Sequence, residues 1–201
     1  MRPIAAAWFG LAIAVSLPHA AMADEGCLAA LTHARIPFVR VGPTRGLRTP
    51  LLVTGPIGSL RLVHMEPRDS RRALMACELV RALSQAEPVF KSLGITDLLY
   101  SEAYDYRTRH GSHRLSEHAH GLAIDVHRFR DWRGNEYSVA RDYPLDDEQG
   151  RVLRTLASQL SQSGQFRLIL TPADNADHWN HFHLEAFPSP MTAVARRAPR
   201  R

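Results

Sequence analysis

Two short segments of the sequence carry side chains that commonly bind zinc. The first runs from Ser116 to Asp125 and the second runs from His178 to His183. Imidazole and carboxylate groups are zinc ligands, and a catalytic zinc site uses three protein ligands and keeps one position open. Together the two segments supply enough ligands for such a site, with histidines left over for a general base. This combination predicts a zinc hydrolase.

The expected metal ligands are His118, Asp125 and His183. The spacing from His118 to Asp125 fits a tight turn at Gly121 followed by a strand. Alternation along that strand places Asp125 on the face opposite Ile124. The apolar face is expected to meet the core, so that Asp125 faces a cleft.

The two remaining histidines of the second segment are the expected catalytic groups. His181 and His183 share one face of a predicted strand, which brings His181 within reach of a zinc-bound water without making it a ligand. His181 is therefore the predicted general base. His178 lies three residues earlier, and we expect it to orient the water or to stabilise a developing oxyanion.

Other histidines of the chain are interpreted as surface or hydrogen-bonded residues. His120 lies inside the first segment but at a variable place, where it either touches the metal or makes an ordinary hydrogen bond. The remaining histidines of the mature chain fall into the second class: His33, His64, His110, His113 and His127.

The elements that must position these residues fit one α+β domain, with a small antiparallel sheet and flanking helices. The length of 201 residues suffices for a single core. Helices are predicted over 27–36, 69–86 and 145–163, with Asp69 or Ser70 as a cap of the second, and strands over 59–65, 95–107, 122–129, 166–171 and 181–187. Residues 39–58 and 130–143 are predicted to form loops and turns.

The first 23 residues are typical of a signal peptide. Arg2 precedes an apolar run over 4–17, and Ala21-Met22-Ala23 fits the cleavage rule. A membrane anchor is the alternative, but the apolar run is shorter than the about 20 residues that a span needs. We therefore expect a mature domain over 24–190, located in the periplasm or secreted, without a stable membrane span.

Export changes the interpretation of the two cysteines. In an oxidising compartment, Cys27 and Cys77 are expected to form one disulfide between the mature N-terminus and the first long helix. Two free buried thiols are the alternative. Neither cysteine is needed for the predicted metal site.

The formal charge of +5 is concentrated near the C-terminus. A nucleic-acid binder carries its positive charge on the folded surface, so nucleic acid is not an expected partner. The tail over 191–201 is expected to be disordered and solvated, or else to touch anionic envelope polymers or lipid head groups. It contains Arg196, Arg197, Arg200 and Arg201.

Three family resemblances follow from these motifs. The segment Ser116–Asp125 resembles the zinc D-Ala-D-Ala carboxypeptidases, because every fixed place of their motif is matched. The element His178, His181 and His183 is similar to that of the penicillin-insensitive murein endopeptidases. Both elements occur together in the extensin-like protein C-terminal family, which the chain resembles over about 27–185. This resemblance implies a hedgehog/DD-peptidase-like fold and peptidoglycan peptides as the substrate.

The resemblance also implies a role for each matched residue. The three expected ligands match the residues that hold one zinc ion, His181 matches the catalytic histidine and His178 matches the assisting one. Arg107 matches an arginine that holds a substrate carboxylate, a task suited to its two-pronged guanidinium. Ser116 matches a serine that helps to place substrate or ligand. Asn180 stands where several relatives have Asp, which increases the importance of His181 as the base.

Two functions remain compatible with the sequence. The first is a zinc-dependent peptidase acting on peptidoglycan stem peptides or crosslinks, and the second is a non-catalytic, zinc-stabilised envelope or wall-binding module. The fourth coordination position separates them, because a side chain there makes a closed structural site. Trp132 and Trp179 either line a substrate groove or pack at its rim. The sequence makes no prediction of the oligomeric state.

Overall fold

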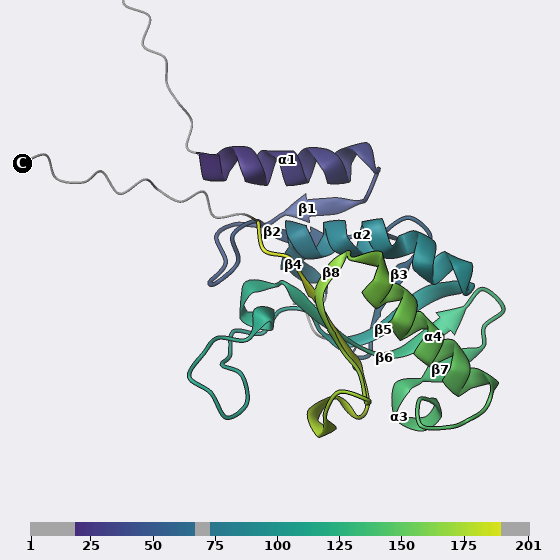
Figure 1. Ribbon diagram of the computed structural model, residues 1–201. Helices are drawn as coiled ribbons and strands as arrows, with labels where there is room; N and C mark the ends of the chain where they lie inside the picture. Colours follow the sequence, from purple (N-terminus) through teal and green to yellow (C-terminus); the bar gives the residue numbers. More distant parts are fainter. Residues whose placement is uncertain (1–18, 67–72, 190–201) are drawn as a thin grey trace, which may run out of the picture.

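The centre of the fold is a six-stranded sheet with the order β3-β5-β6-β9-β8, in which β7 pairs with β6 (Figure 1). The computed structural model describes residues 19–66 and 73–189. Neighbouring strands are antiparallel except for β3 and β5, which are parallel. The strands are β3 (Arg61–His64), β5 (Ile95–Glu102), β6 (Ala123–Asp131), β7 (Glu136–Ser138), β8 (Phe166–Leu170) and β9 (Phe182–Ala186). The predicted α+β class is confirmed.

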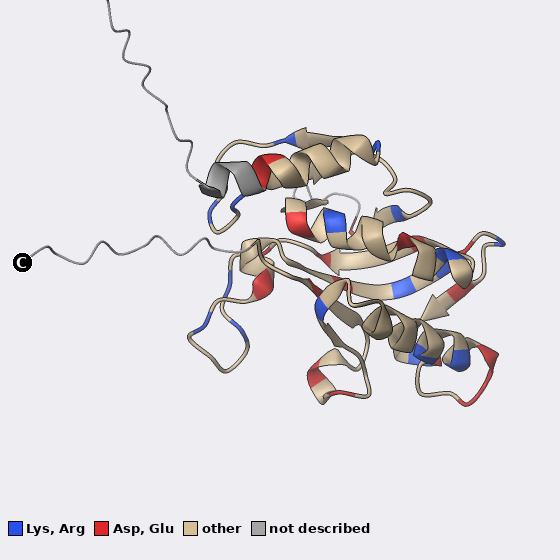
Figure 2. Cartoon of the chain, turned by 45° about the horizontal axis from the view of Figure 1, so that its top comes forward, with Lys and Arg blue, Asp and Glu red and all other residues tan. Residues whose placement is uncertain are grey.

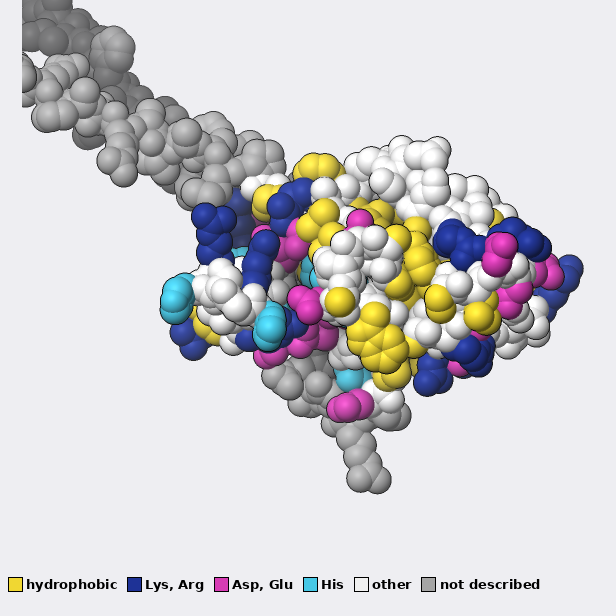
Figure 3. Space-filling model, turned by 60° about the horizontal axis from the view of Figure 1, so that its bottom comes forward, with side chains coloured by type: hydrophobic (Ala, Val, Ile, Leu, Met, Phe, Trp, Pro, Cys, Tyr) yellow, Lys and Arg dark blue, Asp and Glu magenta, His cyan; other side chains and the backbone are white. Residues whose placement is uncertain are grey.

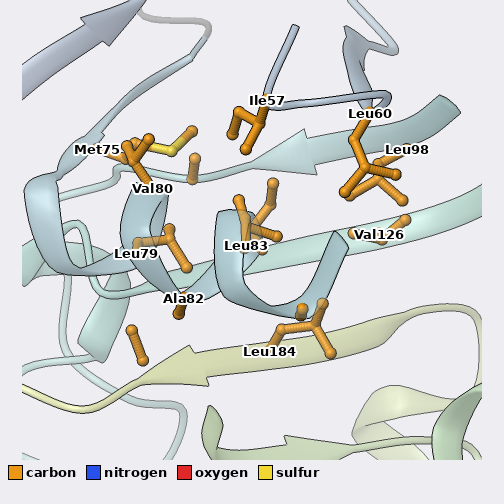
Figure 4. Packing of buried hydrophobic residues seen from close by; sticks show 14 of the residues in the cluster. Ile57, Leu60, Met75, Leu79, Val80, Ala82, Leu83, Leu98, Val126 and Leu184 are labelled. Atoms are coloured by element: carbon orange, nitrogen blue, oxygen red, sulfur yellow. The ribbon is translucent and has the colours of Figure 1, made fainter. Parts of the chain in front are cut away.

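Two long helices cover one face of this sheet. They are α2 (Cys77–Ser92) and α4 (Glu148–Ser163), and a short helix, α3 (Val139–Asp142), precedes α4. In Figure 4, apolar side chains of α2 meet those of β5, β6 and β9, among them Leu83, Leu98, Val126 and Leu184. Burial of each such side chain stabilises the fold by about 2 kcal/mol. Because this face is apolar, polar residues that alternate with it along β6 and β9 lie on the opposite face.

A smaller unit precedes and flanks the main sheet. It consists of α1 (His19–His33) and a three-stranded antiparallel sheet of β1 (Phe38–Arg40), β2 (Pro50–Val53) and β4 (Leu74–Ala76). The disulfide between Cys27 and Cys77, with sulfurs 2.03 Å apart, joins α1 to the first residue of α2. This bond agrees with the pairing expected from the sequence.

Several local predictions were wrong. Residues 39–58 contain β2 and most of β1. The predicted helix over 69–86 begins only at Cys77, after β4, and α2 ends at Ser92. Strands of three or four residues beside Pro and Gly are too short to show alternation, which explains why they were missed. Residues 130–143 likewise contain the end of β6, β7 and α3, and α1 ends before Ile36. The proposed caps Asp69 and Ser70 lie outside the described residues.

Most of the predicted signal peptide and all of the predicted tail over 191–201 lie outside the described residues, and the predicted cleavage point after Ala23 falls within α1. Among the described helices, none has the length and apolar composition required to cross a bilayer. In the view of Figure 2, basic and acidic residues are interspersed over helices, strands and loops.

Candidate metal centre

A short turn places His118 in the interior. The turn η1 (Glu117–His120) begins at Ser116, whose Oγ accepts a hydrogen bond from the backbone N–H of His118 at 3.3 Å. It ends at Gly121, which has φ +62°, and a Cβ there would lie 2.8 Å from the backbone nitrogen of Ala76. Only glycine satisfies both conditions without strain, which confirms the predicted tight turn.

Strand pairing brings the other two predicted ligands together. Asp125 on β6 and His183 on β9 are direct register partners. Ile124 and Leu184, their neighbours along the chain, are fully buried on the helix-covered face. Because successive side chains of a strand point to opposite faces, Asp125 and His183 lie on the other face of the sheet, as alternation in the sequence predicted.

The three predicted ligands converge on one point. His118 Nε2 lies 3.2 Å from Asp125 Oδ2 and 3.2 Å from His183 Nδ1, and His183 Nδ1 lies 2.7 Å from Asp125 Oδ1. Ligand atoms at zinc–ligand bond lengths of about 2.1 Å in a tetrahedron are separated by about 3.4 Å. The donor set and its spacing therefore fit a zinc ion held by these three residues.

Burial and hydrogen bonding set the charges of this group. Burial favours a protonated Asp125, but hydrogen bonds with His118 and His183 outweigh it and hold the pKa of the carboxyl well below its usual range. Burial opposes a charged His183, yet its hydrogen bonds with Asp125 and Glu185 raise the pKa of the imidazole to about 9. A cation is thus favoured beside Asp125, and a bound metal would replace the proton of His183.

The predicted base lies beside the three ligands. His181 Nε2 is 3.5 Å from Asp125 Oδ1, and its Nδ1 is 2.8 Å from Asn180 Oδ1. Burial lowers the pKa of His181 to about 4, so its ring is neutral near neutral pH. Because a neutral ring must donate to the amide oxygen through Nδ1, Nε2 is left as a proton acceptor facing the centre. His181 precedes β9 rather than lying within it, which corrects the predicted start of the last strand.

His178 completes a second grouping of histidines. Its Nδ1 lies 2.6 Å from Asn175 Oδ1. Ligand atoms of His178, His181 and His183 all lie within 4.8 Å of one another. The ring of His178 is 5.0 Å from that of His181, between centroids. His178 can therefore assist the same centre, or join His181 in contacting an ion.

A cleft of about 550 Å³ opens over the predicted ligands. Leu168 and Leu170 of β8 and Trp179, which is 61% exposed, lie along it with Arg109 and His110. Arg109 and His110 belong to the loop between β5 and η1, which projects at the left of Figure 1 and bears basic and histidine side chains in Figure 3. The cleft thus combines apolar, aromatic and cationic contacts.

The residues expected to bind substrate lie at the cleft but already have partners. Arg107 Nη2 is 2.6 Å from Glu102 Oε2, and its Nε is 3.3 Å from Asp105 Oδ2. Ser116 lines the cleft while its hydroxyl caps η1. A substrate carboxylate would therefore have to displace or share the acidic partners of Arg107.

The remaining candidates lie apart from the three ligands. His120 Nδ1 is 3.1 Å from the carbonyl oxygen of Gly46, which is the ordinary hydrogen-bonded alternative. His127 is half-buried, with Nδ1 3.1 Å from the carbonyl oxygen of Asn180. Trp132 is exposed beside Gly94 and does not line the cleft, unlike Trp179.

Two charged residues at the site were not singled out from the sequence. Glu185 Oε1 lies 3.1 Å from His183 Nε2, and its other oxygen pairs with Arg167 of β8. Alternation could have identified Glu185, because it lies two residues after His183 on the same strand face. No local pattern points to Arg167, whose contact depends on the pairing of β8 with β9.

The chain belongs to the extensin-like protein C-terminus family, whose sequence pattern matches residues 55–193. The matched region contains β3 to β9 and every predicted ligand and catalytic residue, but it leaves out α1, β1 and β2. No curated protein matches the chain.

Proposed function

We propose that the protein is a zinc-dependent peptidase that hydrolyses peptide bonds in peptidoglycan stem peptides or crosslinks, in the periplasm or outside the cell. The main support is the convergence of His118, Asp125 and His183 beneath a cleft, with the neutral ring of His181 beside them. Peptidoglycan is favoured as substrate by the resemblance of both motifs to murein peptidases. Export is favoured by the signal-like N-terminus and the disulfide.

The proposed chemistry divides between the ion and the protein. His118, Asp125 and His183 would hold zinc, which when bound supplies the Lewis acidity that favours attack of water on a carbonyl carbon. His181 Nε2 accepts the proton of the attacking water, since Nδ1 is committed to Asn180, and returns it to the departing amine as the peptide C–N bond breaks. His178, at the rim of the same cleft, would orient the attacking water by accepting its hydrogen bond through Nε2, since Nδ1 is committed to Asn175.

Substrate orientation would come from the walls of the cleft. Arg107 binds a carboxylate of the peptide by exchanging one of its contacts with Glu102 or Asp105. Leu168 and Trp179, on the other side, offer apolar contact to the opposite end of the substrate. A short peptide with a free carboxylate near the cleaved bond fits this distribution.

The test is release of muropeptides from purified sacculi by the zinc-loaded protein, with mass spectrometry of the products. His183→Ala should lose both zinc and activity. His181→Gln should keep zinc and lose activity by about 10²–10⁴-fold, the usual contribution of general acid–base catalysis. His120→Gln is the matched control, because His120 lies in the same turn but contacts Gly46. Unchanged zinc content and activity in His183→Ala would refute the proposal.

The same centre also supports a second candidate, a non-catalytic, zinc-stabilised wall-binding module. The observation that favours it is the proximity of His181 Nε2 to Asp125, 3.5 Å, which would allow His181 to fill the fourth position. A site closed in this way is structural. In that case His181→Gln lowers zinc affinity and thermal stability, and the wild-type protein binds sacculi without releasing fragments.

A further inference from the structure

A charged pair lies beside the metal centre, the buried Glu185 and the exposed Arg167, and the proposed chemistry does not use either residue. Glu185 is 3% exposed and lies on the same face of β9 as His183. Burial of a carboxylate costs free energy unless the group is paired and hydrogen-bonded, so Glu185 needs partners. Both of its oxygens are engaged, one by His183 and the other by Arg167.

The two ring nitrogens of His183 have different partners. Nδ1 faces the centre, 2.7 Å from Asp125 Oδ1 and 3.2 Å from His118 Nε2, whereas Nε2 lies 3.1 Å from Glu185 Oε1. A carboxylate accepts hydrogen bonds but cannot donate them. Glu185 therefore requires the N–H at Nε2. In the zinc-free fold Asp125 accepts a second N–H from Nδ1, and when a bound ion replaces that proton, the lone pair of the neutral ring lies on Nδ1.

An irregularity in β8 brings Arg167 to this carboxylate. Phe166 pairs with Ala186 and Leu168 pairs with Glu185, so Arg167 is an extra residue between them. Such a bulge redirects the side chain of the extra residue. The guanidinium of Arg167 contacts Glu185 and also lies, through Nη2, 3.1 Å from Glu117 Oε1.

Glu117 extends the connection to the other histidine ligand. It is the residue before His118, in the turn η1, and it also accepts a hydrogen bond from Arg109 at 3.0 Å. Arg167 thus links the strand that carries His183 to the turn that carries His118. These two elements are far apart in the sequence, and their relative position determines whether the ligand nitrogens can share one ion.

We propose that Glu185 and Arg167 are positioning residues of the metal centre: Glu185 fixes Nδ1 as the ligand nitrogen of His183, and Arg167 holds Glu185 and aligns the turn of His118. This inference rests on the proposed zinc site but not on peptide hydrolysis. Partners that orient a histidine ligand typically contribute about 10–100-fold to metal affinity. A contribution of that size is expected for Glu185, with a smaller one for Arg167.

Zinc affinity, measured by competition with a chromophoric chelator, tests the inference in the full-length protein. Glu185→Ala should weaken zinc binding by about 10–100-fold, and Glu185→Gln, which keeps an acceptor oxygen, by only severalfold. Arg167→Met should fall between Glu185→Gln and the wild type. Asp97→Asn is the matched control, because Asp97 is an equally buried carboxylate that pairs with Arg61 on the same sheet but contacts no predicted ligand. It should leave zinc affinity unchanged.

A second measurement separates positioning from a general loss of stability. In zinc-loaded protein labelled with ¹⁵N-histidine, the ring shifts of His183 should identify Nδ1 as the ligand in the wild type and in Glu185→Gln. A mixture of Nδ1 and Nε2 ligation is expected in Glu185→Ala, or, if that variant does not fold, in Glu185→Leu, which fills the same space without an acceptor oxygen. Wild-type affinity and pure Nδ1 ligation in these variants would overturn the inference alone. Failure of the wild type to bind zinc would instead overturn the proposed function and the inference together.

Discussion

Two buried carboxylates on neighbouring strands of the same sheet have different kinds of partners. Asp97 on β5 is 1% exposed and is held by Arg61 through Nε at 2.6 Å and Nη2 at 2.8 Å. Asp125 on β6 is 8% exposed and is surrounded by His118, His181 and His183. The sheet therefore provides similar burial in both places, and the partners determine what each carboxylate can do.

The partners differ in whether they can give up their protons. An arginine keeps its charge and has no lone pair for a metal, so the contact of Asp97 with Arg61 is a permanent ion pair that joins β3 to β5. A histidine can be neutral, and its ring nitrogen can then bind a metal. The group around Asp125 can thus exchange a proton for a cation, whereas the group around Asp97 serves stability.

The largest expected effect comes from removing each carboxylate's charge. Asp125→Asn should weaken zinc binding about a thousandfold, because one of three ligands carries roughly a third of a binding free energy of about 10–16 kcal/mol. Asp97→Asn should leave zinc binding intact and lower the free energy of unfolding by about 2 kcal/mol, less than for a fully buried pair because Arg61 is largely exposed. Chelator competition and denaturant unfolding measure the two quantities.

This contrast between Asp125 and Asp97 would be contradicted if the two variants exchanged their effects on zinc binding and on stability. Loss of zinc from Asp97→Asn, with retention in Asp125→Asn, would place the metal in another part of the molecule. Equal losses of stability without any change in zinc binding would make both carboxylates structural.

The next effect is a dependence of zinc affinity on pH. His183 has a pKa of about 9 in the zinc-free fold, above its ordinary value of 6.5. Its protonated form therefore stabilises the zinc-free protein below about pH 6.5, and this contribution is lost as the pH rises through about 9. Zinc needs the deprotonated nitrogen, so its affinity should rise about tenfold per pH unit across this window and level off above it.

Arginine keeps its charge across the same pH range. The ion pair of Asp97 with Arg61 is therefore expected to contribute no pH dependence between pH 6.5 and 9. Isothermal titration in buffers of different ionisation enthalpy would count the protons released on zinc binding. A zinc affinity that is flat between pH 6.5 and 9, with no proton released, would contradict the assignment of His183 as a ligand.

A smaller effect is expected from the turn that supports the Asp125 group. Gly121→Ala combines φ +62° with a Cβ only 2.8 Å from a backbone nitrogen, whereas Gly164→Ala has φ +66° and no atom within 4 Å. Both should lose about 1 kcal/mol of stability from the left-handed conformation. Gly121→Ala should lose about 1–3 kcal/mol more and bind zinc severalfold more weakly, because His118 must shift. Equal stability and zinc affinity in the two variants would show that the turn does not position His118.

The predictable part of the molecule was the part encoded in local patterns. Alternation along 122–129 placed Asp125 opposite the apolar face, and Gly121 identified the turn that delivers His118. Helical periodicity located α4 to within a few residues, and the helix ends at the left-handed Gly164. The donor atoms of all three predicted ligands are within reach of one ion because each of these local patterns holds in the fold.

Features that depend on contacts between distant segments were not predictable. The strands β1, β2 and β4 are too short to show a period, and their pairing depends on register across loops. The contact of Arg167 with Glu185 requires a bulge in β8 that the sequence does not mark.

Anomalous diffraction at the zinc edge, from crystals of the zinc-loaded protein, tests the metal centre most directly. We expect one strong peak within bonding distance of His118 Nε2, an oxygen of Asp125 and His183 Nδ1, with a solvent-accessible fourth position and His181 nearby but not coordinated. A peak bound by His178 and His181 instead, or no peak after equilibration with zinc at neutral pH, would contradict the assignment.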